Sequence, residues 1–452
     1  MRKPFKLRNI TLRDIKLSHM VRSLLPALIL LPTAAFIVGF SLPARAVAPA
    51  DVMPAAATPA QVTRPEIEIV EGPDRLVPTA VAIVAITADG HVAKSPVKAV
   101  VLDPVTLHAV LKGREDGREI AVADAAVIAA GAVPWRVPAR PFSKPELARL
   151  SWNKVEPKGR EYWNTEPPTM KFSWKTVPYL ETPVQRGAAW IVADAKPTTY
   201  DGNRAGHGTM RFQLVYLRDG KRLATPGASA LNPLRPDPVF RVAYSGATRF
   251  PMINHALELC NVPYIFGSES PTQKDADHQS EYSYGVDCAD LVSYASRHSG
   301  LPIPYGFTGT FDPAAGRTTL VKRPVKTKDG VYLDRAGNPI RWGAGGVQPQ
   351  DLVLFDGKQR HIGILYKDMP PLGVLDENDV IVHTLCDAPT FVKVSEAYDQ
   401  TFSVVRIKQP APVLAEAPTP LKRAVLAADA PAAPAGTPAG TTAARPGKRS
   451  GS

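Results

Sequence analysis

Three residues in the C-terminal part of the chain carry side chains that could act together in nucleophilic catalysis: Cys288, His361 and His383. A cysteine thiol can attack a carbonyl carbon if a nearby imidazole takes its proton. A second polar residue can hold that imidazole in the required orientation. The question for the sequence is therefore whether these three residues lie on elements that could bring them together.

The residues around Cys288 predict a helix that begins at the cysteine. Asp287 is a favourable N-cap and Gly300 a favourable residue just beyond a helix end. Between them, residues recur at helical spacing: Leu291, Val292, Ala295 and Ser299. In the first turn, free N–H groups and the helix dipole stabilise an anion, so we expect a lowered thiol pKa. The alternative is a buried cysteine that packs as a small hydrophobic residue.

The two histidines fall on predicted strands. Residues 351–355 and 361–366 flank a turn at 356–358 and predict a hairpin, with His361 at the start of the returning strand. Residues 379–385 predict a third strand, on which Ile381, His383 and Leu385 share one face. A nucleophile, a base and an orienting residue could meet there. The alternative is that both histidines are ordinary hydrogen-bonded residues.

In this order, the motifs resemble those of the NlpC-type cell-wall cysteine peptidases, over about residues 252–407. The resemblance rests on five segments, which include an Asp-Cys pair opening a helix and a His-x-Gly-Ile strand: 262–267, 287–292, 351–355, 361–364 and 381–383. It implies an α+β fold class, with a papain-like cysteine peptidase domain (helices packed on an antiparallel sheet) preceded by a β-rich domain.

The resemblance also implies roles for individual residues. Cys288 would be the nucleophile, His361 the general base and His383 the orienting third member. The Tyr264 hydroxyl would lie near the nucleophile, and Asp287 would cap the helix and face a substrate amine. Backbone N–H groups at the helix start would hold the oxyanion. The implied reaction is hydrolysis of a peptidoglycan stem peptide through a thioester, typically between a D-glutamyl residue and a diamino acid.

Departures from the family pattern leave other functions open. Ala289 and Asp290 stand where the family usually has Ser-Gly, and the stretches 268–283 and 306–347 are long. An amidase or acyltransferase with the same triad on another substrate is one alternative, and an inactive cell-wall-binding scaffold is another. The sequence predicts no cofactor and no metal, because the group Asp275, Asp277 and His278 has no second histidine at a ligand spacing.

The N-terminus predicts export. Residues 1–46 hold eight Lys and Arg against one Asp, with an uncharged run from Leu24 to Leu42 before Ala44-Arg45-Ala46. This pattern is typical of a signal peptide, and the alternative is an uncleaved membrane anchor. Such an anchor is the only membrane contact that we expect. The chain would be periplasmic, secreted or in the cell envelope. Peptidoglycan or muropeptides would be its partners. Nucleic acid is not expected, because the rest of the chain is only mildly basic and has no basic-aromatic patch or nucleic-acid motif.

Composition predicts the remaining domains. An Ala/Pro-rich spacer at 47–65 precedes a β-rich accessory domain at 66–248, a catalytic domain at 249–408 and a disordered Ala/Pro/Gly-rich tail at 409–452. The accessory domain would target or gate the site. Within it, Asp219-Gly220 predicts a hairpin, 105–112 and 143–150 read as short helical pieces, and five tryptophans either form a core or bind glycan. Cys260 and Cys386 could form a disulfide and leave Cys288 free.

Overall fold

The structure is a computed structural model of the 452-residue chain. It describes residues 75–166, 169, 171–172, 175, 177–200, 206–232, 235–312, 317–357, 360–398 and 401–407. The predicted signal peptide, the spacer and the C-terminal tail lie outside the described residues. No helix among the described residues is both long and apolar enough to cross a membrane. All described residues belong to one compact unit, Ala48–Ser452.

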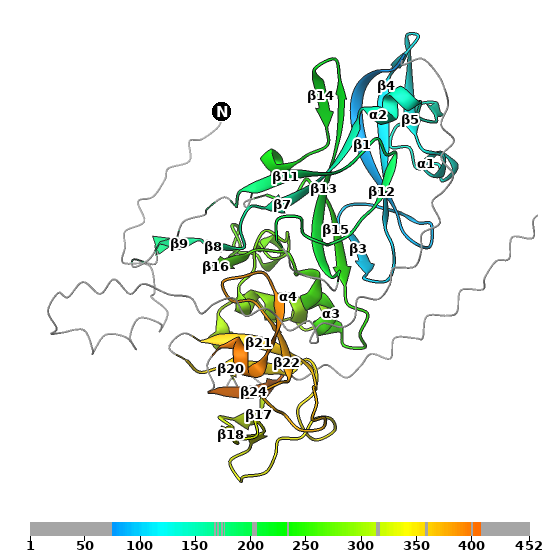
Figure 1. The fold of residues 1–452 in the computed structure, drawn as a ribbon. Coiled ribbons are helices and arrows are strands. Elements are labelled where there is room, and N and C mark those ends of the chain that lie inside the picture. The colour runs from blue at the N-terminus through cyan, green and yellow to red at the C-terminus, as the bar shows by residue number, and fades with distance from the viewer. Residues whose placement is uncertain are drawn as a thin grey trace, which may run out of the picture. The chain divides into compact units, whose positions relative to one another are not determined.

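Strands dominate residues 77–245, which we call the β-rich half (Figure 1). Its strands are β1 Val77–Ile86, β2 Val92–Ala93, β3 Val97–Val100, β4 Thr106–Glu115, β5 Arg118–Ala123, β6 Ala139–Arg140, β7 Leu150–Pro157, β8 Glu161–Trp163, β9 Thr165–Glu166, β10 Lys171–Phe172, β11 Tyr179–Arg186, β12 Trp190–Val192, β13 Gly208–Arg218, β14 Lys221–Ala224 and β15 Phe240–Ser245. Two short helices, α1 Ala125–Ala129 and α2 Lys144–Ala148, and a 3₁₀ turn, η1 Ala228–Ala230, interrupt them.

Two six-stranded sheets make up most of this half. One runs β2-β1-β4-β5-β6 with β12 on β4, and the other runs β11-β7-β13-β15-β3 with β14 on β13. Side chains from both sheets share one buried cluster, in which Leu107, Trp152 and Phe212 are fully buried. Apolar and β-branched residues favour such strands because they pack on a pleated surface. The predicted hairpin at Asp219-Gly220 is confirmed, since β13 and β14 pair across it.

Residues 251–407, which we call the C-terminal half, hold the candidate site residues. Its helices are α3 Pro251–Glu258, α4 Cys288–His298 and α5 Val394–Ala397, with 3₁₀ turns η2 Asp275–Asp277 and η3 Thr308–Phe311. Its strands are β16 Tyr264–Phe266, β17 Thr318–Lys322, β18 Val325–Lys326, β19 Tyr332–Leu333, β20 Leu352–Phe355, β21 His361–Lys367, β22 Val380–His383, β23 Thr390–Lys393 and β24 Phe402–Arg406. Six of these strands form one sheet in the order β17-β24-β20-β21-β22-β23.

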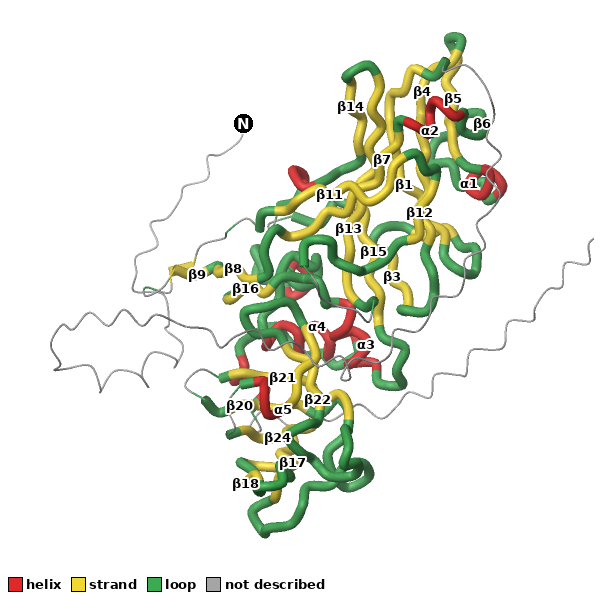
Figure 2. Tube along the Cα trace, viewed as in Figure 1, coloured by secondary structure: helices red, strands yellow, loops and turns green. Residues whose placement is uncertain are grey.

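The predicted fold class was wrong. The described residues form 24 strands and only five α-helices, spread over several sheets (Figure 2), which is not an α+β papain-like fold with helices packed on a sheet. Only α3 and α4 are longer than five residues. The prediction rested mainly on the periodic segments around Cys288. Many of the strands have two to four residues, too few for their alternation to register as a pattern.

The short helical piece expected near 105–112 was also wrong, because these residues lie in strand β4. Leu107, Ala109 and Leu111 face the shared cluster of the β-rich half, and Val110 faces a second cluster with Val84 and Ala121. A strand buried on both faces has a continuous apolar sequence, which periodicity alone cannot separate from a buried helix.

A buried ionic group joins the two halves directly before the predicted nucleophile. Arg211 on β13 is 3% exposed, and its Nη2 donates to the carbonyls of Tyr282 at 3.1 Å and Ser283 at 2.9 Å. Its Nε donates to Asp237 at 2.5 Å, and Arg241 on β15 also donates to the Tyr282 carbonyl. The β-rich half therefore fixes the backbone that leads into α4.

We predict that Arg211→Met will lower the free energy of unfolding by about 3–5 kcal/mol, because it leaves the Asp237 carboxylate buried without its closest partner. Urea unfolding of the full chain measures this. The matched control is Arg222→Met, which removes a half-exposed pair with Glu181 and should cost about 1 kcal/mol or less. Equal losses in the two variants would contradict the assignment of Arg211 as the link between the halves.

Candidate active site

Helix α4 begins at Cys288, as the sequence predicts. The Asp287 carboxylate accepts hydrogen bonds from the backbone N–H groups of Ala289 at 2.9 Å and Asp290 at 3.0 Å. The Asp290 carboxylate in turn accepts from the Asp287 N–H at 3.4 Å, which completes a capping box. These bonds satisfy donors that every helix start leaves free, and they fix Cys288 as the first helical residue.

The segment before the cysteine is fixed by β16. The Val286 N–H donates to Pro263 at 3.1 Å, and the Ile265 N–H donates to Val286 at 3.2 Å, so this segment runs beside β16 as a parallel bridge. Gly285 precedes it, and any Cβ there would clash with the side chain of Ile265. The close approach explains why glycine stands at this position, two residues before the cap.

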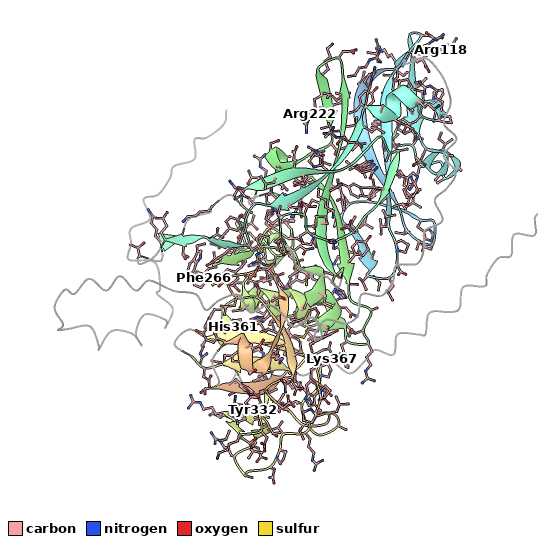
Figure 3. All side chains as sticks on the ribbon, in the orientation of Figure 1. Arg118, Arg222, Phe266, Tyr332, His361 and Lys367 are labelled. Carbon is pink, nitrogen blue, oxygen red and sulfur yellow. The ribbon has the colours of Figure 1, made fainter. Side chains whose placement is uncertain are left out.

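The structure brings His361 and His383 together. They lie on β21 and β22, and His361 Nε2 is 2.8 Å from His383 Nδ1. Both side chains are buried, with exposed fractions of 1% and 7%. The predicted hairpin is confirmed as well, because β20 and β21 pair with Phe355 opposite His361. Figure 3 labels His361 in the C-terminal half. The predicted base and orienting residue thus form a hydrogen-bonded pair.

Cys288 approaches strand β21 at Ile362, the residue that follows His361. Its thiol is close to the backbone N–H of Ile362, and it packs with the buried cluster that contains Ile362. The His361 ring instead stacks on Phe355, a member of the cluster on the other face of the sheet, with ring centroids 5.6 Å apart. Successive strand residues face opposite sides, so the alternation separates the two side chains.

No hydrogen bond joins the Cys288 sulfur to either imidazole among the described residues. His361 Nδ1 is a buried atom without a hydrogen-bond partner in that part of the chain. Nδ1 is therefore the nitrogen of His361 that can accept a proton, because Nε2 is hydrogen-bonded to His383. Catalytic hydrogen bonds are often long or poorly aligned in enzymes without bound substrate.

The electrostatics of the site keep both groups neutral at pH 7. Burial raises the pKa of the Cys288 thiol well above its usual value, and the Asp287 carboxylate raises it further, while the Ile362 N–H acts in the opposite direction. Burial lowers the pKa of His361 well below its usual value, and His383 lowers it further. Burial also lowers the pKa of His383 to about 4. Burial and the Asp287 carboxyl therefore act against the lowered thiol pKa that we expected from the helix start.

The Tyr264 hydroxyl lies in the same region. Burial raises the pKa of Tyr264, and the Cys288 thiol is the next largest cause of the increase, followed by Asp287. Cys260 and Cys386 are free, so the disulfide that the sequence left open is not formed. Burial raises the pKa of Cys260 to about 12, which fits a thiol that serves only in packing.

A second polar group lies beside the helix start, and the sequence did not anticipate it. The Ser268 hydroxyl donates to Asp290, and His278 Nε2 is 3.6 Å from the Asp290 carboxylate. The Tyr305 ring stacks on His278 with centroids 3.8 Å apart. Burial raises the pKa of Asp290 to about 7 and lowers that of His278 to about 4. Asp290 occupies a position where the NlpC-type pattern usually has glycine, which was the available signal.

The three residues that the sequence considered as metal ligands do not meet. His278 faces Asp290, Asp275 accepts from Arg297 at 2.7 Å, and Asp277 accepts from the Tyr282 hydroxyl at 3.0 Å. Among the described residues, no group of three or more His, Cys, Asp and Glu side chains is arranged to hold a metal ion.

We predict that Asp287→Asn will lower the pKa of the Cys288 thiol. Asparagine keeps the N-cap acceptor and removes the negative charge, so the thiolate forms at lower pH. Alkylation by iodoacetamide between pH 7 and 10, followed residue by residue with mass spectrometry, measures the change. Cys386 is the internal control, and its rate profile should stay as in the unmodified chain. An unchanged or higher apparent pKa at Cys288 would contradict the prediction.

Comparison with known proteins gives no relative for this chain: no family model, no curated protein and no solved structure matches it. The resemblance to NlpC-type peptidases therefore stays a hypothesis that rests on the five motif segments. Any function must be argued from the residues that the fold places around Cys288.

Proposed function

We propose that this chain is an exported cysteine peptidase or amidase that hydrolyses an amide bond in the stem peptide of peptidoglycan. The observation that carries the proposal is the hydrogen-bonded pair of His361 and His383, one residue from the Ile362 N–H that faces the Cys288 thiol. The order of the motifs and the signal-like N-terminus support the choice of a cell-wall substrate.

The reaction starts from a neutral thiol. As Cys288 Sγ attacks the carbonyl carbon, His361 Nδ1 takes the thiol proton, and the carbonyl π electrons move to oxygen. His361 Nε2 then carries the hydrogen that it donates to His383 Nδ1, which fixes the tautomer of the base. Because the His361 ring lies with the cluster on the other face of β21, the proposal requires this ring to move to the side of Cys288 before Nδ1 can take the proton.

The oxyanion needs donors at the same helix start. The Ala289 and Asp290 N–H groups are engaged by the Asp287 cap, so the Cys288 N–H is the helix-start donor left for the oxyanion. When the intermediate collapses, the C–N bond breaks and His361 returns its proton to the leaving amine. Water, deprotonated by the same imidazole, then hydrolyses the thioester and releases the acid and the free thiol.

We predict that Cys288→Ala and His361→Ala will each lower kcat for muropeptide hydrolysis by about 10³-fold or more, and His383→Ala by about 10²-fold. Mass spectrometry of the digest identifies the bond that is cleaved. His91→Ala, a substitution at an exposed side chain of the β-rich half, is the control and should have no effect. Cleavage of a different amide would favour the amidase or acyltransferase function, and full activity of Cys288→Ala would overturn the proposal.

We also predict the pH dependence. Because burial lowers the pKa of His361, the base stays neutral in acid, so the acidic limb of kcat/KM should lie well below the free imidazole value of about 6.5. The unfolded chain binds a proton at His361 more readily than the folded chain does, so the free energy of unfolding falls as the pH drops below ~6.5. Circular dichroism must therefore show that the chain is folded at each pH. A limb at or above the free value, in folded protein, would contradict a buried base.

A further inference from the structure

We propose that Glu161 of the β-rich half is a specificity-determining residue of this site, and that its carboxylate binds a primary ammonium group of the substrate. This inference rests on the proposed function and deepens it. It gives the β-rich half a direct part in substrate recognition, in place of the targeting or gating role expected from the sequence.

Strand pairing places Glu161 at the site. Strand β8 pairs in parallel with β16, with Glu161 opposite Tyr264 and Trp163 opposite Phe266. Directly paired residues present their side chains on the same face of a sheet. Glu161 therefore lies beside Tyr264, whose hydroxyl is close to the Cys288 thiol. The Trp163 and Phe266 rings confirm the shared face, because their centroids are 4.7 Å apart. Phe266 is labelled in Figure 3.

The Glu161 carboxylate has capacity for a ligand. It accepts a hydrogen bond from the Trp163 indole N–H at 2.8 Å and another from the Cys386 thiol. A carboxylate has about four lone-pair sites, so these two neutral donors leave acceptors free. No Lys, Arg or His side chain among the described residues forms an ion pair with it. The neighbouring Arg160 is already paired with Asp387, at 2.9 Å.

The charges around the thiol select the ligand. Asp287 and Asp290 are among the groups that raise the pKa of the Cys288 thiol, and Asp287 and Glu161 are among those that raise the pKa of Tyr264, so carboxyl groups surround these two side chains. A site of one charge sign favours a substrate group of the opposite sign. The half-buried rings of Trp163 and Phe266 offer apolar surface to an alkyl stem that ends in an ammonium group. The side chain of a diamino acid has both features.

The test compares two stem peptides that differ only in acetylation of the diamino-acid side-chain amine. The unmodified protein should cleave the free-amine peptide with a kcat/KM about ten-fold or more above that of the acetylated peptide, since hydrogen bonds to charged groups contribute this much. Glu161→Gln should lose this preference through KM, with kcat changed less than about two-fold. Glu166→Gln, which removes an exposed carboxylate on β9, should behave as the unmodified protein.

The outcomes separate the two proposals. If Glu161→Gln keeps the preference, or the unmodified protein shows none, the assignment of Glu161 is overturned while the peptidase function stands. If neither peptide is cleaved, the peptidase proposal fails. Calorimetric titration of both peptides into Cys288→Ala, with and without Glu161→Gln, then decides the role of Glu161. The role is supported if Cys288→Ala binds the acetylated peptide more weakly than the free-amine peptide and the double variant binds both equally. It is overturned if Cys288→Ala already binds the two peptides equally.

Discussion

The start of helix α4 is the constraint on which the rest of the site depends. A helix start leaves its first N–H groups without partners, and here the Asp287 carboxylate takes two of them. The cap determines that the helix begins at Cys288 rather than one turn earlier or later. Two contacts hold the segment that precedes Asp287. Strand β16 pairs with Val286, and Arg211 donates hydrogen bonds to the carbonyls of Tyr282 and Ser283.

Burial sets the chemical character of the site. Desolvation disfavours the charged forms of both the thiol and the imidazole, so both groups are neutral at rest. A neutral pair has little tendency to form a thiolate that reacts with other electrophiles. In the proposed reaction, charge would develop only when the sulfur attacks a substrate carbonyl and backbone donors are present to stabilise the oxyanion.

Local signals in the sequence predicted local structure well. The Asp287 cap, the hairpin that carries His361 and the strand that carries His383 all follow from spacing over fewer than about fifteen residues. The fold class did not follow, because it depends on how many short strands assemble. The face of β21 on which each side chain lies also did not follow. A shift of one residue in the register would move each side chain to the opposite face of the sheet. Because apolar residues lie on both faces of β21, the sequence pattern does not show which face His361 is on.

Pairing between β8 and β16 links segments far apart in the chain; the Asn164 side chain, for example, donates to the Gly267 carbonyl 103 residues later. Closing a loop of about 100 residues costs about 4 kcal/mol of chain entropy before any contact offsets it. Because this cost comes before the contacts that offset it, pairings between distant segments are slow to form. The face that carries Tyr264 and Glu161 is therefore complete only when strands from both halves are paired. A chain in which the two halves have not docked therefore has the cysteine but lacks the face that carries Tyr264 and Glu161.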